Sequence, residues 1–161
     1  MEVRLAHRGD AEAIRAIYNV EVAGSTATFD IVERSIDEQL EWLDRHSGAH
    51  PAVVAVEGAD VCGFGSLSSY RDRAAYSTSV EDSVYVDEAW RRKGVGLLLL
   101  VELVELATRH GFHTVIGRIA GGNEASVVLH EACGFEVIGV EREVGRKFGR
   151  WLDVTLVQRL L

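Results

Sequence analysis

The stretch VEDSVYVDEAWRRKGVG, residues 80–96, decides the fold that this sequence predicts. Its first seven residues read as a β-strand, with three valines on one face and Glu81, Ser83 and Tyr85 on the other. A glycine-containing turn then leads into an apolar helix, residues 94–110, which ends before a glycine. The first N–H groups of a helix are free and carry partial positive charge, so a strand, a basic glycine turn and a helix in this order predict an anion site.

Basic residues immediately before the two glycines of the turn strengthen this interpretation. The chain has 17 Lys and Arg against 25 Asp and Glu, a net charge of -8, so three consecutive cations reverse the charge locally. A glycine at a helix start also has purely structural explanations, and both interpretations stay open on the loop alone. Two other phosphate motifs are excluded: no G-x-x-x-x-G-K-[ST] occurs, and Leu99 stands where a dinucleotide fingerprint needs its third glycine.

Segments with the hydrophobic period of strands and of helices alternate along the whole chain. We expect strands at residues 2–6, 52–57, 61–69, 80–86, 114–119, 135–142 and 150–160, and helices at 10–22, 94–110 and 123–133. A further helix opens at the capping box Ser35–Glu38, and the turn at 58–60 indicates a hairpin. The predicted fold class is α/β, with a mixed, mostly antiparallel central sheet and helices on both faces, in a single domain over residues 1–161.

Composition restricts the partners and the compartment. With 161 residues, 47% of them hydrophobic, the chain supports one well-buried core. The negative net charge opposes binding to nucleic acid and to anionic membranes. Cys62 and Cys133 lie far apart, and the pairs His46/His50 and His110/His113 lack further ligands, so we expect neither a disulfide nor a metal site. No secretory signal is visible at the start, and we expect a cytoplasmic protein.

Arg91-x-x-Gly94-x-Gly96 matches the acyl-CoA signature [RQ]-x-x-G-x-[GA] of the GNAT acetyltransferase superfamily. Within it the chain resembles the phosphinothricin N-acetyltransferase group. The resemblance rests on the blocks Tyr18-Asn19, TATFD (26–30), SVEDSVYV (79–86), LHE (129–131) with Gly134-Phe135, and GRKFGRWLD (145–153). These blocks span nearly the whole chain in the order of that group, which implies the GNAT fold, acetyl-CoA as co-substrate and a homodimer.

The resemblance assigns the acetyl-CoA contacts to three parts of the sequence. They are the strand end Val84, Tyr85 and Val86; the loop and first helical turn Arg91, Arg92, Lys93, Gly94, Val95, Gly96 and Leu97; and the start of a later helix, Asn123 and Ser126. By the same resemblance, a bulge in the strand would direct backbone N–H groups near Val86 at the thioester carbonyl. Asn123 is equally explained as a helix N-cap.

Two residues are implied as catalytic. Attack of an amine on a thioester needs a neutral amine, a stabilised oxyanion and a proton for the departing thiolate. The resemblance implies that Glu81 is the general base, although a polar strand face can also simply meet solvent. His130 ends the pattern N-x-x-S-x-x-x-H begun at Asn123, where most of the superfamily has tyrosine, and is implied to protonate the thiolate; a structural histidine is the alternative.

The resemblance also implies the acceptor. The residues matching Arg73 and Tyr76 hold the substrate's carboxylate, Lys147 faces its phosphinate-like end, and Phe29 and Trp151 are apolar walls or ordinary core aromatics. The implied acceptor is a small amino acid with a second polar tetrahedral group, such as phosphinothricin or methionine sulfoximine.

Two other functions stay open at this stage. A non-catalytic CoA-binding regulatory module would keep the loop and need neither Glu81 nor His130. A peptide or protein N-acetyltransferase would keep the chemistry and change the acceptor.

Overall fold

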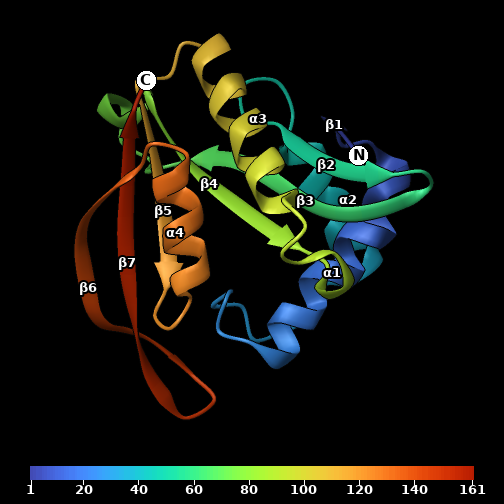
Figure 1. Cartoon of the computed structure of the whole chain (residues 1–161). Coiled ribbons are helices and arrows are strands. Elements are labelled where there is room, and N and C mark those ends of the chain that lie inside the picture. Colours follow the sequence, from blue (N-terminus) through green and yellow to red (C-terminus); the bar gives the residue numbers. More distant parts are fainter.

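The computed structural model describes all 161 residues and contains one seven-stranded sheet with the strand order β1-β2-β3-β4-β5-β7-β6 (Figure 1). The strands are β1 (Glu2–Leu5), β2 (Ala52–Glu57), β3 (Asp60–Ser69), β4 (Ser79–Val86), β5 (Thr114–Ala120), β6 (Glu136–Lys147) and β7 (Arg150–Leu160). The helices are α1 (Ala11–Gly24), α2 (Ile36–Arg45), α3 (Val95–Arg109) and α4 (Glu124–Ala132), with 3-10 turns at Arg8–Asp10, Ala74–Tyr76 and Glu88–Trp90. Only β4 and β5 pair in parallel, so the predicted mixed, mostly antiparallel sheet is confirmed.

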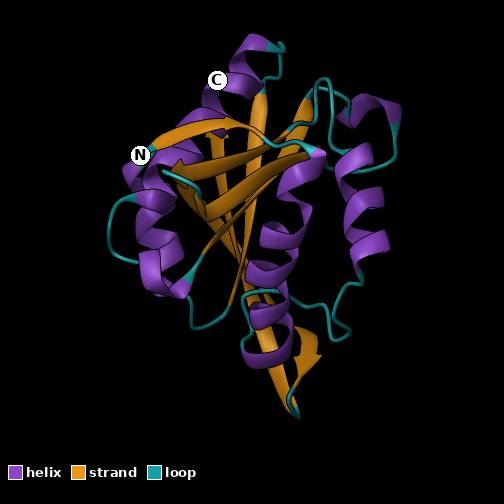
Figure 2. Cartoon of the chain, turned by 90° about the vertical axis from the view of Figure 1, so that its right-hand side faces the viewer, coloured by secondary structure: helices purple, strands orange, loops and turns teal.

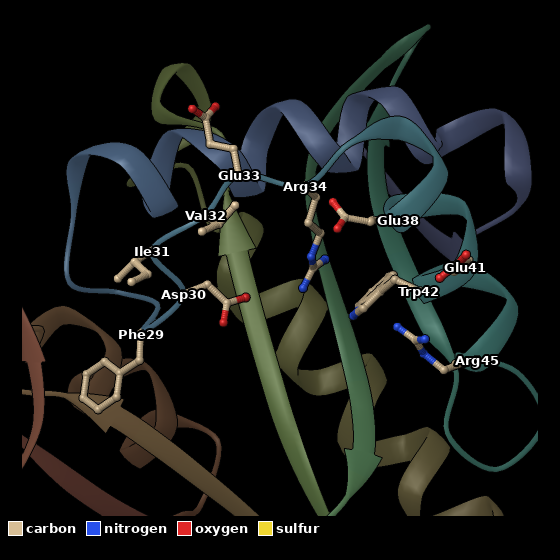
Figure 3. Close-up of a pocket in the computed structure, with 10 residues that line it drawn as sticks. All are labelled: Phe29, Asp30, Ile31, Val32, Glu33, Arg34, Glu38, Glu41, Trp42 and Arg45. Atoms are coloured by element: carbon tan, nitrogen blue, oxygen red, sulfur yellow. The ribbon is translucent and has the colours of Figure 1, made fainter.

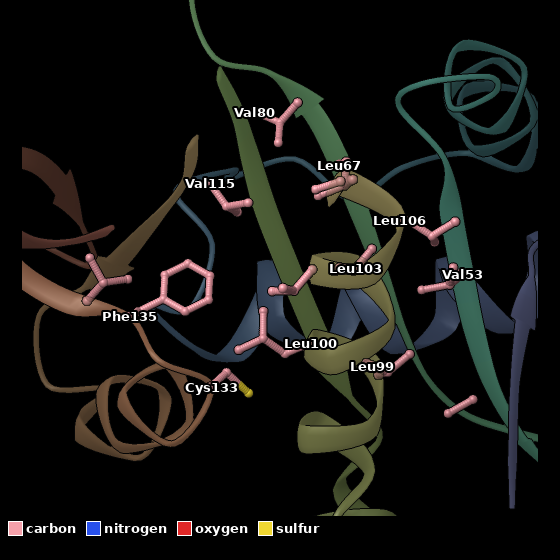
Figure 4. Packing of buried hydrophobic residues seen from close by; sticks show 14 of the residues in the cluster. Val53, Leu67, Val80, Leu99, Leu100, Leu103, Leu106, Val115, Cys133 and Phe135 are labelled. Atoms are coloured by element: carbon pink, nitrogen blue, oxygen red, sulfur yellow. The ribbon is translucent and has the colours of Figure 1, made fainter. Parts of the chain in front are cut away.

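Helices cover both faces of the sheet, as predicted (Figure 2). On one face, α1 and α2 pack over Val54 and Phe64. On the other, the leucines of α3 pack over β2, β3 and β4 (Figure 4). Two separate apolar cores therefore hold the central strands from both sides. No helix of the fold is both long and apolar enough to cross a membrane.

Most element boundaries follow the local signals in the sequence. Ser35 Oγ accepts the Glu38 N–H at 3.2 Å and the Glu38 carboxylate accepts the Ser35 N–H at 2.7 Å, which is the predicted capping box. Gly58 and Gly111 have φ of 61° and 81°, as a tight hairpin and a helix C-terminus require. The exception is β6, which continues past the predicted end at residue 142 to Lys147, because this polar stretch pairs with β7 after a break in register.

Strands β4 and β5 separate part-way along their length. They pair from Ser79 and Thr114 to Asp82 and Gly117, and then β5 continues with β7 while β4 continues with β3 (Figure 1). We call this point of separation, with the free edge of β4 from Ser83 to Val86, the fork. Past it, β4 has no strand neighbour on the β5 side.

Glycines in β3 allow α3 to lie close to the sheet. A Cβ at Gly63 would lie 2.8 Å from the Tyr85 carbonyl oxygen and 3.2 Å from Leu99 Cδ1, and one at Gly65 would lie 2.9 Å from Leu103 Cδ1. Any side chain there would push the helix, or β4, outward.

We predict that Gly63→Ala lowers the free energy of unfolding by roughly 1–3 kcal/mol, since the added methyl overpacks against backbone that cannot rotate away. Chemical denaturation measures it. Gly139→Ala is the matched control, because a Cβ at Gly139 on edge strand β6 meets nothing within 4 Å. Equal effects of the two changes would contradict the close packing of α3.

Candidate active site at the fork

The basic loop forms an anion site at the start of α3. Gly94 is the N-cap in a left-handed conformation, φ 83°, and Leu98 makes the first helical hydrogen bond, to the Gly94 carbonyl at 3.1 Å. The N–H groups of Val95, Gly96 and Leu97 therefore have no partner within the protein. The predicted free N–H groups are present. They lie at the N-terminus of a 15-residue helix, where the helix dipole adds partial positive charge.

The cations of this loop differ in what they contact. Arg91 forms an ion pair with Glu21 of α1, whose side chain is only 10% exposed, and its Nε lies 3.4 Å from the Val86 carbonyl. Arg92 is exposed and makes no ion pair, and Lys93 lies 4.8 Å from the Trp90 ring. The signature arginine thus ties the loop to α1, and the charge free to meet an anion comes from Arg92 and Lys93.

The free edge of β4 presents backbone groups beside this loop. Asp87 N–H donates to the Cys62 carbonyl at 3.0 Å, and the β3–β4 register runs without a shift from Val80 to Val86. Hydrogen-bonded and non-bonded pairs alternate in an antiparallel ladder, so the N–H and C=O of Val84 and Val86 face away from β3, into the fork. The expected bulge in this strand is wrong: regular pairing with β3 and the departure of β5 free these groups instead.

The loop and the fork adjoin each other. A Cβ at Gly96 would lie 3.1 Å from Leu129 Cδ2 of α4 and 3.7 Å from Val86 Cγ2. The first turn of α3 therefore packs between the end of β4 and α4, which places the anion site at the open end of the fork.

Glu81 lies on β4 one residue before the last β4–β5 pair, opposite Ile116. Burial raises the pKa of its carboxyl, the nearby charges of Asp82 and Glu141 raise it further, and Arg118 opposes them. Arg118 itself pairs with Glu141 at 2.9 Å. No protein hydrogen bond engages the Glu81 carboxyl, so a half-buried carboxylate of raised pKa is free to accept a proton.

His130 lies at the same fork on the opposite face of β4. Its Nδ1 is 2.7 Å from the Ser126 carbonyl and its Nε2 is 3.0 Å from Asp82 Oδ2. A Cβ at Gly117 would lie 3.0 Å from Nε2, so the ring covers the β5 residue of the last pair. Asp82 was not predicted as a site residue, because no local sequence pattern indicates that it contacts His130, 48 positions away.

Asn123 takes the role that its position at a helix start suggests. Its Oδ1 accepts the Ser126 N–H at 3.3 Å and so caps α4. This cap fixes the turn whose carbonyl holds the His130 ring. Contact of Asn123 or Ser126 with acetyl-CoA stays a prediction.

The predicted acceptor residues fall into two groups. Phe29 packs against Gly145, where its ring leaves no room for a Cβ, and buried Lys147 donates to the carbonyls of Thr28 (2.9 Å) and Glu21 (3.4 Å). These contacts join the segment after α1 to the β6–β7 hairpin. Trp151 is 60% exposed beside Arg146, so the interpretation as a core aromatic is wrong.

Arg73 and Tyr76 lie apart from that group, on the β3–β4 connection just before the strand of Glu81. Arg73 is exposed and makes no ion pair, and the Tyr76 ring lies edge-on to Tyr70 at 5.5 Å. Arg71, rather than Arg73, lies over both rings.

A pocket of about 610 Å³ lies between the segment after α1 and helix α2 (Figure 3). Its lining residues are Phe29, Asp30, Ile31, Val32, Glu33, Arg34, Glu38, Glu41, Trp42 and Arg45. Arg34 and Arg45 make no ion pair, and the Arg34 guanidinium lies 3.8 Å from the centre of the Tyr18 ring. Sequence reasoning missed this pocket, because the segment has no periodicity that would bring Arg34 over an aromatic ring.

Comparison with known proteins agrees with this geometry. The family model described as an acetyltransferase (GNAT) domain matches residues 3–156. The chain is 39% identical to an L-methionine sulfoximine/L-methionine sulfone acetyltransferase of Pseudomonas aeruginosa over 97% of this chain and 92% of that protein. It is 36% identical to a phosphinothricin N-acetyltransferase of Streptomyces coelicolor over 100% of this chain and 96% of that protein.

A solved structure extends the comparison to the cofactor. The phosphinothricin acetyltransferase of Sinorhizobium meliloti, in complex with acetyl-CoA, superimposes with a TM-score of 0.96 at 38% identity, covering 99% of this chain and 88% of that one. The free N–H groups of α3 and the fork beside them are thus found in a fold that binds acetyl-CoA in a relative. On this family match and full-length likeness, the chain belongs to the GNAT family of acetyltransferases.

Proposed function

We propose that this protein transfers the acetyl group of acetyl-CoA to the α-amine of a small amino acid with a second polar tetrahedral group, of the phosphinothricin or methionine sulfoximine type. The observation that carries the proposal is the fork itself. β4 carries a half-buried carboxylate of raised pKa just before the fork and free backbone donors along it, and a basic helix N-terminus lies at its open end. The names of the relatives in both substrate classes support the choice of acceptor.

In this proposal acetyl-CoA lies along the free edge of β4. Its pyrophosphate meets the N–H groups of Val95, Gly96 and Leu97 with Arg92 and Lys93 nearby. The backbone of Val84, Tyr85 and Val86 lines the acyl end, and a backbone N–H there stabilises the oxyanion. The protein supplies the donors that this placement needs: the N–H groups of Val95, Gly96 and Leu97 have no partner within the protein, and those of Val84 and Val86 face away from β3.

Glu81 takes a proton from the amine as its nitrogen attacks the thioester carbon. A bond forms between nitrogen and carbon, the carbon–sulfur bond breaks, and the thiolate takes a proton from the His130 side of the fork. The raised pKa of Glu81 brings the base closer to the working pH, which favours proton transfer in the transition state.

The acceptor's polar groups have cationic partners on two sides. Lys147 uses two carbonyls, so the third N–H of its ammonium remains for an acceptor oxygen, with Phe29 beside it. Arg73 and Tyr76 approach from the β3–β4 connection and would take the carboxylate, since a guanidinium binds carboxylates in a bidentate manner.

Release of free thiol from acetyl-CoA with a panel of acceptors tests the function. We expect turnover with phosphinothricin, methionine sulfoximine or methionine sulfone, and little with peptides of free N-terminus. No release with any acceptor would indicate a CoA-binding regulatory module. Release with peptides alone would indicate a protein N-acetyltransferase, and either outcome overturns the proposal.

The pH profile tests Glu81 as the base. Glu81→Gln is expected to lower kcat on the order of a hundredfold with acetyl-CoA affinity unchanged. In the wild type the acid limb of kcat/KM lies above the ordinary range of a glutamate, because burial raises the pKa of Glu81. Arg118→Gln removes a charge that lowers this pKa, so the limb moves to higher pH.

Arg109→Gln is the control for Arg118, since Arg109 is an exposed arginine on α3 that also pairs with a glutamate, Glu102, at 3.0 Å. It should leave the profile unchanged. A limb that moves equally in both variants, or in neither, removes Glu81 from the proton transfer.

We further propose that the protein is a cytoplasmic homodimer. Support for self-association comes from the exposed apolar side chains of β6 and β7: Val137, Ile138, Val140, Val144 and Trp151. Sedimentation velocity should give a dimer in the wild type and a monomer for the double variant Val140→Glu, Val144→Glu. A monomeric wild type contradicts the proposal.

A further inference from the structure

We propose that Asp82 is a positioning residue of the acetyl transfer, whose carboxylate holds the His130 ring as a doubly protonated imidazolium beside the departing sulfur. The role in catalysis rests on the proposed function. The charge state rests on the protein alone.

Both ring nitrogens of His130 face oxygen acceptors. Nδ1 meets the Ser126 carbonyl at 2.7 Å and Nε2 meets Asp82 Oδ2 at 3.0 Å. A neutral imidazole has one N–H and one lone pair, and the lone pair would then point at an oxygen. With Asp82 ionised, only the doubly protonated ring satisfies both contacts.

The imidazolium and the Asp82 carboxylate are both buried, so each charge needs the other for compensation. The side chains are 5% and 1% exposed for His130 and Asp82, and His130 is the sole donor to the carboxylate, whose Oδ1 has no protein partner. A buried charge is retained only when it is paired. Removing the carboxylate would therefore leave the imidazolium without compensation.

The other charged and titratable groups around the pair do not replace Asp82. Glu81 precedes it on β4 and projects to the opposite face. The glutamates of α4, Glu124 and Glu131, are exposed to solvent. The Cys133 thiol after α4 is buried, and Arg159 of β7 donates to the Cys133 carbonyl. Burial lowers the pKa of His130, but the hydrogen bond and charge of Asp82, with the Ser126 carbonyl, outweigh it and raise that pKa above its ordinary value.

The position of the ring connects the pair to the reaction. Asp82 and Gly117 form the last β4–β5 pair, and a Cβ at Gly117 would lie 2.6 Å from Val157 Cγ2 and 3.0 Å from the ring Nε2, so the ring lies close over this pair. The imidazolium thus lies where the free edge of β4 begins, on the face opposite Glu81. As the carbon–sulfur bond breaks, sulfur keeps the electron pair. Both ring N–H groups stay bonded to Asp82 and the Ser126 carbonyl, so the imidazolium stabilises the thiolate by its positive charge. The thiolate then takes a proton from solvent and Glu81 releases the proton of the amine to solvent, so the protons balance.

Asp82→Asn tests the inference, because it removes the charge and keeps the size of the side chain. The first measurement is the protonation of His130, followed by ¹⁵N NMR of the imidazole nitrogens across pH. We expect a doubly protonated ring at neutral pH in the wild type and a neutral ring in the variant, where burial lowers the pKa of His130 and only the hydrogen bond to the Ser126 carbonyl opposes it. His46 is an internal reference, since it is half-buried, bonds to the Trp42 carbonyl and the Ser68 hydroxyl, and should titrate alike in both proteins.

The second measurement is kcat against pH with the best acceptor of the panel. In Asp82→Asn the alkaline limb is expected to move to lower pH, with kcat at pH 8 reduced about tenfold or more and the KM for acetyl-CoA within about twofold. A purely structural pair would lower the melting temperature and leave the shape of the profile unchanged, which overturns the inference. A neutral His130 in the wild type also overturns it.

The two proposals fail in different ways. The NMR titration needs no acceptor, so a panel without turnover rejects the proposed function. A His130 that titrates identically in wild type and Asp82→Asn rejects this inference.

Discussion

The separation of β4 from β5 after the Asp82–Gly117 pair is the constraint on which the rest of the site depends. A strand that loses a neighbour exposes N–H and C=O groups that must find other partners. Here β4 stays straight because β3 holds it in unbroken register to Val86, and β5 leaves because β7 pairs with it as far as Ala120. The sheet therefore provides a row of rigid, unoccupied donors without any loss of order.

The two faces of the sheet contribute different parts to this fork. On the α3 face, Gly63 and Gly65 let the helix approach the strands, and Gly96 lets its first turn pack beside Val86. The anion site of the helix is thereby placed at the end of the β4 edge. On the other face, Arg91 pairs with Glu21 at the end of α1, and Lys147 bonds to the carbonyl of the same Glu21. One residue of α1 thus connects the phosphate loop to the hairpin proposed to hold the acceptor.

Short-range sequence patterns made much of the fold and part of the site predictable. Three features depend only on residues a few positions apart, and all were predicted from the sequence. They are the capping box at Ser35, the glycines at 94 and 111 and the alternation of side chains along β4. The contacts that complete the site join positions far apart, such as Asp82 with His130, Glu21 with Arg91 and Lys147 with Thr28. No periodicity reports such pairs. The same limit explains why Trp151 was assigned to a wall or a core and is found exposed, since its environment depends on which face of the β6–β7 hairpin is covered.

The period of two in a β-strand gives the adjacent carboxylates Glu81 and Asp82 opposite surroundings. Asp82 projects to the face where α4 supplies His130, so its charge is neutralised within the protein. Glu81 projects to the other face, where Arg118 is already shared with Glu141 and burial raises the pKa of the carboxyl. The negative charge of Asp82 also raises the pKa of Glu81 through the strand between them. If Asp82 lost its cation, that repulsion would grow, and Glu81 would be protonated over more of the pH range. The Asp82–His130 pair on one face of β4 therefore limits how far the pKa of Glu81, the proposed base, rises on the other face.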